Sequence, residues 1–172
     1  MRTLFARLSA ALFLVVAIIG GGFFMVEQFS SRLYYEEITQ RLNASIAMYV
    51  TGEMQLMENG EVNEDALTLL AQRAMIINPT VEVYLLGKDG RILAHAMPPE
   101  SIQSDQVALE PVQKLMGGET EMPLRGTDPR NTDRQKIFSA HPVMHNDVLQ
   151  GYLYAILGGQ KYDELADSVR GS

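Results

Sequence analysis

An apolar run near the N-terminus limits the fold more than any other feature of this sequence. Residues 8–26, LSAALFLVVAIIGGGFFMV, contain no charged side chain. At about 1.5 Å of rise per residue, a helix of this length covers roughly 28 Å, close to the hydrocarbon thickness of a bilayer. Backbone amides find no water in lipid, so a single apolar segment that spans it must be helical. The run therefore predicts one transmembrane helix.

The charges that flank the run predict its orientation. Arg2 and Arg7 precede it, and Glu27 follows it. Positive charge accumulates on the cytoplasmic side of membrane helices. Residues 1–7 are therefore expected in the cytoplasm, and residues 27–172 are expected outside it.

A cleaved secretory signal is the alternative, because it also combines a basic start with an apolar core. Gly20 and Gly22 are small residues that could precede a cleavage site. Against cleavage, the apolar character continues through residues 23–26, and helical spacing follows without a break. Both interpretations place the remaining chain outside the cytoplasm.

Composition limits the partners of the extracytoplasmic part. With Arg2 and Arg7 set aside, 21 acidic residues face 12 basic ones, which gives a net charge of −9. Such a charge argues against nucleic acid as a partner. The chain has no cysteine, so it forms neither a disulfide nor a thiolate metal site. About 145 residues remain after the apolar run, enough for one domain with a core.

The next stretch keeps helical spacing but becomes amphipathic. From residue 27 to residue 58, apolar side chains recur mostly at three- and four-residue steps, and Asn59-Gly60 follows as a pair suited to a helix end. A stalk helix is predicted over residues 27–58. Its apolar stripe is longer than one small core can cover, so we expect a homodimer through the stalk.

The remaining elements follow from caps and from changes of period. Asn63 is a suitable N-cap, and the residue before Pro79 is pushed out of helical geometry. Alternating strand formers surround the turn GKDG, and a second such pattern surrounds His145-Asn146-Asp147. The predicted elements are a helix at 63–77, a hairpin at 81–96, a surface loop at 122–135, a hairpin at 136–157 and a C-terminal helix at 162–169.

This order of elements, with three short motifs, resembles a known family. The motifs are VYLLGKDGRILAH at residues 83–95, FSAHPV at residues 138–143 and QGYLYAILGG at residues 150–159. They resemble extracytoplasmic PAS-like sensor domains, called Cache or PDC domains. More narrowly, the chain looks like the N-terminal input region of a bacterial membrane sensor histidine kinase.

The resemblance implies an α+β fold with a central antiparallel sheet of about five strands, flanked by helices, in a protein of the bacterial inner membrane. It implies signalling by helix displacement across that membrane. We then expect residues 162–169 to lead to a second transmembrane helix and to a kinase region that binds ATP and Mg²⁺ and acts on a response regulator. No catalytic site is expected within these 172 residues. A chemoreceptor, a cyclic-dinucleotide enzyme and a secreted solute-binding protein are the alternatives.

Candidate binding residues come from the loop at 122–135 and from two strands. Guanidinium groups bind carboxylates in a bidentate manner, so the basic loop residues suggest a small carboxylate ligand. The alternative is that Asp128 and Asp133 only neutralise a solvated loop. The three histidines lack metal-ligand spacing, so neither a metal nor a cofactor is expected in this chain. The candidate residues are His95, Arg125, Arg130, Arg134, Lys136 and His141.

Overall fold

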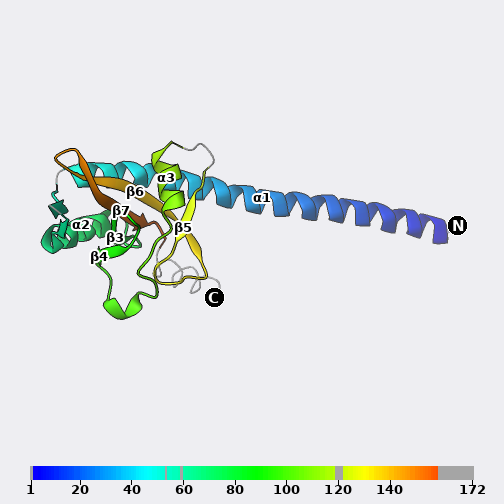
Figure 1. Cartoon of the computed structure of the whole chain (residues 1–172). Helices are drawn as coiled ribbons and strands as arrows, with labels where there is room; N and C mark the ends of the chain where they lie inside the picture. The colour runs from blue at the N-terminus through cyan, green and yellow to red at the C-terminus, as the bar shows by residue number, and fades with distance from the viewer. Residues whose placement is uncertain (1, 53, 59, 119–121, 159–172) are drawn as a thin grey trace. The chain divides into compact units, whose positions relative to one another are not determined.

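The computed structural model describes residues 2–52, 54–58, 60–118 and 122–158. These residues form an N-terminal apolar helix and a curled, five-stranded antiparallel sheet with helices (Figure 1). The predicted α+β class is therefore confirmed. The predicted C-terminal helix at 162–169 lies outside the described residues.

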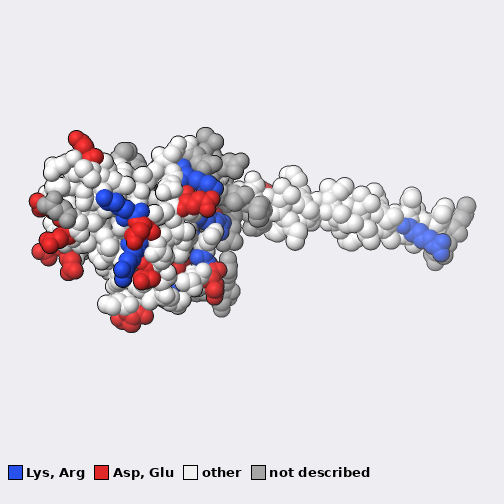
Figure 2. All heavy atoms as spheres, viewed as in Figure 1, with Lys and Arg blue, Asp and Glu red and all other residues white. Residues whose placement is uncertain are grey.

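The first helix, α1 (Arg2–Gly52), contributes to two compact units that divide after Glu36. In the N-terminal unit, the stretch Leu4–Glu27 is long and apolar enough to cross a membrane, and its most apolar window is not buried at all. Figure 2 shows almost no charge along this stretch, with a basic group near its N-terminal end. A continuous exposed apolar surface of this kind indicates a partner such as lipid. This suggests a membrane anchor, as the predicted span at 8–26 does.

The predicted stalk helix is wrong at its C-terminal end. The structure ends α1 at Gly52 and forms a small antiparallel hairpin from β1 (Met57–Glu58) and β2 (Glu61–Val62). Gly60 lies in the turn between them with φ +87, a conformation that glycine adopts without strain. Leu56 and Met57 are almost fully buried, so the chain leaves the helix where these side chains enter the core.

The second helix, α2 (Glu64–Ile77), confirms the helix predicted at 63–77. The Asn63 side chain accepts a hydrogen bond from the Ala66 N–H at 3.0 Å, which satisfies one of the unpaired donors of the first turn. The Asn78 N–H donates to the Ala74 carbonyl and closes the helix. The buried side chains of α2 are Leu67, Leu70 and Ala71.

The strands of the main sheet are β3 (Glu82–Gly87), β4 (Ile92–His95), β5 (Arg125–Thr127), β6 (Gln135–His145) and β7 (Val148–Ile156). They have the order β4-β3-β7-β6-β5, and every neighbouring pair is antiparallel. Both predicted hairpins are present, one formed by β3 and β4 and the other by β6 and β7. The first and last strands of this sheet in chain order, β3 and β7, pair at its centre, with Tyr84 opposite Tyr154.

The segment predicted as a loop at 122–135 contains a strand. Residues Arg125–Thr127 form β5, which pairs with the start of β6. Gly126 is needed there, because a Cβ atom at this position would collide with the Tyr154 hydroxyl and would lie 3.0 Å from the Phe138 ring. Three residues, one of them glycine, give no alternating pattern, so the sequence does not reveal the strand.

The two faces of the sheet carry separate apolar clusters. Leu85 and Leu153 belong to the cluster that packs against α2, and Tyr84 and Tyr154 belong to the other. The second face is covered by α3 (Leu109–Met116) and the connections around it, whereas η1 (Pro99–Ser101) buries no side chain. This second face also holds the buried polar groups described next.

Candidate functional site

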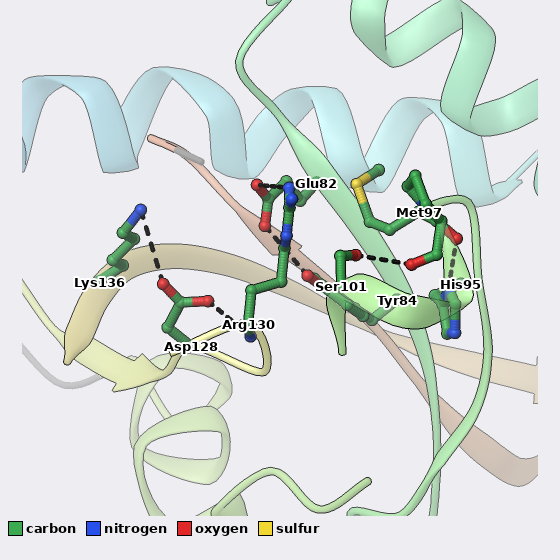
Figure 3. A network of polar contacts seen from close by, with 9 residues as sticks. Glu82, Tyr84, His95, Met97, Ser101, Asp128, Arg130 and Lys136 are labelled. Atoms are coloured by element: carbon green, nitrogen blue, oxygen red, sulfur yellow. Dashed lines mark hydrogen bonds and ion pairs between the residues drawn. The ribbon is translucent and has the colours of Figure 1, made fainter. Parts of the chain in front are cut away.

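A buried ion pair lies on the tyrosine face of the sheet. Glu82, the first residue of β3, is opposite Ile156 of β7. Its Oε1 accepts a hydrogen bond from Arg130 Nη1 at 2.9 Å, and only 6% of the Glu82 side chain and 20% of the Arg130 side chain are exposed (Figure 3). Burying both charges is unfavourable unless each is paired, so this contact holds the loop that carries Arg130 onto the sheet.

Two tyrosines lie beside the ion pair. The Tyr84 hydroxyl donates to Glu82 Oε2 at 3.0 Å, and the Tyr154 hydroxyl donates to the Thr127 carbonyl at 2.8 Å. Burial raises the pKa of Tyr84, and the Glu82 carboxylate raises this pKa further. Burial also raises the pKa of Tyr154. Both phenols therefore stay neutral and act as hydrogen-bond donors at physiological pH.

Asp128 organises the loop from which Arg130 extends. It is 3% exposed. Its Oδ1 accepts from the Arg130 N–H at 3.0 Å, and its Oδ2 lies 3.5 Å from Lys136 Nζ. The Asp128 carbonyl accepts from the Asn131 N–H at 3.1 Å and forms the turn. The alternative expected Asp128 to neutralise a loop that is exposed to solvent. This carboxylate lies in the interior instead.

The loop that contains Gln103 and Ser104 contacts the loop that carries Arg130. The Gln103 and Ser104 N–H groups donate to the Pro129 carbonyl at 2.8 and 3.1 Å. His95 lies at the end of β4, with its ring 6.3 Å from the Tyr84 ring, and its Nδ1 is 3.0 Å from the Met97 carbonyl (Figure 3). Glu82, Tyr84, Asp128, Arg130 and Lys136 form what we call the polar network, with His95 at its margin.

The structure brings together only some of the predicted site residues. Arg130 and Lys136 belong to the polar network, and His95 is adjacent to it. His141 is opposite Leu153 and therefore lies on the other face of the sheet, the face that α2 covers. His95 and His141 thus do not share a pocket. Burial lowers the pKa of His141, which favours the neutral ring.

Arg125 and Arg134, the other two predicted residues, are not among the five residues of the polar network. Arg125 is an exposed residue of β5, opposite Ile137 of β6. Arg134 is also exposed, and its backbone closes the turn, because its N–H donates to the Asn131 carbonyl and its carbonyl accepts from the Asp128 N–H.

Sequence reasoning missed Glu82, although a signal was present. The strand reads EVYLLG, and every residue in it is buried. A lone carboxylate in such a strand predicts a buried partner, because buried acids are almost always paired. The partner lies 48 residues further along the chain, so only the folded structure identifies it.

Gln40 of α1 was also missed, and it connects the helix to the sheet. Its side chain is fully buried. Its Nε2 donates to the Leu124 carbonyl at 2.9 Å and to the Phe138 carbonyl at 2.7 Å, and its Oε1 accepts from the Leu124 N–H at 2.8 Å. Leu124 directly precedes β5, and Phe138 lies in β6. One glutamine therefore joins α1 to the two strands that flank the Asp128 loop.

The polar network is balanced in charge. Two carboxylates are matched by two cations, and the neighbouring phenols donate hydrogen bonds. Across the described residues, no three His, Asp or Glu side chains come together as a metal site.

Comparison with known proteins adds no relative. No family model, no curated protein and no solved structure matches the chain. The polar network and the Gln40 hydrogen bonds between α1 and the sheet are therefore the observations that bear on its function.

Proposed function

We propose that this chain is the extracytoplasmic, PAS-like input domain of a membrane-anchored sensor, in the first instance a bacterial sensor histidine kinase. The sheet with its first and last strands paired at the centre supports the PAS-like assignment. The apolar stretch Leu4–Glu27 supports the anchor in the inner membrane. In this proposal, the work of residues 37–158 is to convert a binding event into movement of α1.

The observation that carries the proposal is the set of hydrogen bonds made by Gln40. The helix that contains the apolar stretch also contains this glutamine, and its amide is bound to both sides of the loop that carries Arg130. These three hydrogen bonds are buried, and leaving any of their polar groups unpaired would be unfavourable. They therefore hold the Gln40 side chain in a single arrangement against the two strands. A change in the loop therefore reaches α1 through bonds, without an intervening flexible joint.

The Glu82–Arg130 pair is the element that would switch. A carboxylate ligand that reaches Arg130 would compete with Glu82 for this guanidinium, because Glu82 Oε1 already accepts from Nη1. The ligand biases the equilibrium only if it binds the two arrangements unequally, and a full switch needs about 5.5 kcal/mol of difference. A helix shift of about 1–2 Å is of the size seen at switching interfaces.

Further partners belong to the same proposal. A second copy would pack along α1 as a homodimer, and a kinase region with ATP and Mg²⁺ would phosphorylate a response regulator. A chemoreceptor or a cyclic-dinucleotide enzyme can use the same input domain. A secreted solute-binding protein is the alternative without a membrane anchor, and mass spectrometry of the N-terminus separates it from the sensor.

Single cysteines test the membrane arrangement, because the natural chain contains none. Thr132→Cys places a thiol on the exposed part of the loop, and Thr3→Cys places one ahead of the apolar stretch. We expect a membrane-impermeant maleimide to label intact cells that carry Thr132→Cys, and to label Thr3→Cys only after permeabilisation. Labelling with the opposite pattern, or recovery of a chain that lacks its first 22 residues, would refute the anchored sensor.

A further inference from the structure

A groove of about 390 Å³ lies at the β4 edge of the sheet, and it includes His95 from the margin of the polar network. One wall is the first half of α2, with Glu64, Leu67 and Thr68, and the other includes Ile102 and Asp105. The edge strand β4 lies between these walls. The volume falls in the range typical of small-molecule sites.

The groove is lined by both polar and apolar side chains, with acidic residues at its margins. Leu93 is exposed, Ala94 and Ile102 are half-buried, and Leu67 is almost fully buried, so the apolar contact area comes mainly from the first three. Glu64 and Asp105 are exposed at the margins. Among the described residues, neither carboxylate has an ion-pair partner, in contrast to the acids of the polar network, and no lysine or arginine lines the groove.

His95 adds a third acceptor to the groove. Its Nδ1 lies 3.0 Å from the Met97 carbonyl. A carbonyl oxygen only accepts, so Nδ1 must carry the proton in this contact. In the neutral form of the ring, Nε2 is then the acceptor. The polar groups therefore share one preference, since all three favour a ligand that brings donors and positive charge.

We propose that this groove binds a small organic cation, an ammonium or guanidinium group attached to a short apolar chain. The apolar part would lie against Leu67, Ala94 and Ile102, and the cation would lie between Glu64 and Asp105. The net charge of −9 beyond the membrane segment raises the local concentration of cations and adds to this preference. The site stands independently of the sensor function, since it requires only the folded domain.

A matched series of probes tests the charge preference directly. The full chain, in phosphatidylcholine nanodiscs, carries labelled Leu, Ile and Ala methyl groups. It is titrated with n-butylammonium, n-butanol and butyrate, which share one apolar chain and differ in their head groups. We expect n-butylammonium to shift the methyl signals of Leu67, Ala94 and Ile102 in a saturable way, n-butanol to bind more weakly, and butyrate to bind most weakly.

Variants at the margins complete the test. Glu64→Gln and Asp105→Asn are each expected to weaken n-butylammonium binding about threefold, and the pair about tenfold, because exposed ion pairs contribute modestly. Asp133→Asn removes an exposed acid outside the groove and should leave the affinity unchanged. Equal or tighter binding of butyrate, shifts that do not saturate, or unchanged affinity in the double variant would overturn the proposal.

Discussion

A single ion pair, Glu82–Arg130, links the outer loop to the centre of the sheet. Truncating one partner of such a pair leaves a charge in a poorly solvated place, and this loss is larger than the net stabilisation the intact pair gives. The exposed pair Lys114–Glu110 on α3 is the natural contrast, with 3.1 Å between its charged atoms and both side chains largely in water. The two pairs should therefore respond very differently to the same substitution.

Glu82→Gln is expected to lower the free energy of unfolding by about 2–3 kcal/mol, because Arg130 loses its charged partner while it stays mostly buried. Glu110→Gln is the matched control and should change stability by less than about 0.5 kcal/mol. Native-state hydrogen exchange of the slowest β7 amides measures both values. Equal effects of the two substitutions would mean that the buried pair contributes no more than a surface pair.

His141 gives a pH prediction. Its pKa is lowered in the folded protein by burial, so the unfolded chain binds the proton more readily. This contribution to stability is complete above the unfolded pKa of about 6.5, and it is lost as the pH falls through that value toward the folded pKa. His141→Gln should therefore weaken the loss of stability between about pH 7 and pH 5. An unchanged pH dependence would exclude His141 as its source.

Only part of the site is visible in the sequence at this scale. Arg130 and Lys136 attract attention because they are basic residues in an acidic domain. Their roles depend on Glu82 and Asp128, whose burial is decided by strand pairing and by the turn at Asn131. The sequence gives the type of each residue, but its contact partner is known only from the folded structure, which brings distant segments together.

Among the elements, those with strong local signals were predicted well. The Asn63 cap defines the start of α2, and the two hairpins have clear turns. The short strand β5 was missed because Gly126 interrupts any pattern, and the end of α1 was misplaced because burial of Leu56 and Met57 overrides the helical spacing. Tertiary contacts decided each of these cases.

The attachment of α1 to the sheet gives a prediction at this scale. Gln40→Leu keeps a side chain of similar length but leaves the Leu124 N–H and carbonyl and the Phe138 carbonyl without their partner. We expect a loss of about 3 kcal/mol and much faster hydrogen exchange at the Leu124 amide.

Arg41→Gln is the control for this substitution. Arg41 is the next residue of α1, and its side chain is 58% exposed in an ion pair with Glu37. Its loss should change stability by about 0.5 kcal/mol or less. If Gln40→Leu proves as mild as this control, α1 is held on the sheet by other contacts.

At the scale of the whole molecule, the proposed sensor should be a dimer through α1. Tyr35 and Leu42 are seven residues apart on this helix, and both side chains are largely exposed. Tyr35→Cys and Leu42→Cys should each give disulfide-linked dimers on mild oxidation in membranes, because a disulfide needs Cα atoms about 4.4–6.8 Å apart. Thr132→Cys, in the loop, should not. Cross-linking of all three at the same low level would contradict the dimer.

The proposed signalling route requires that the polar network and α1 are energetically coupled. A double-mutant cycle of Glu82→Gln and Gln40→Leu, followed by hydrogen exchange of the full chain in nanodiscs, measures this coupling. We expect the double variant to differ from the sum of the single effects by about 1–2 kcal/mol. Additivity within about 0.3 kcal/mol would show that the network and the helix are independent, and it would contradict the proposed route of signalling.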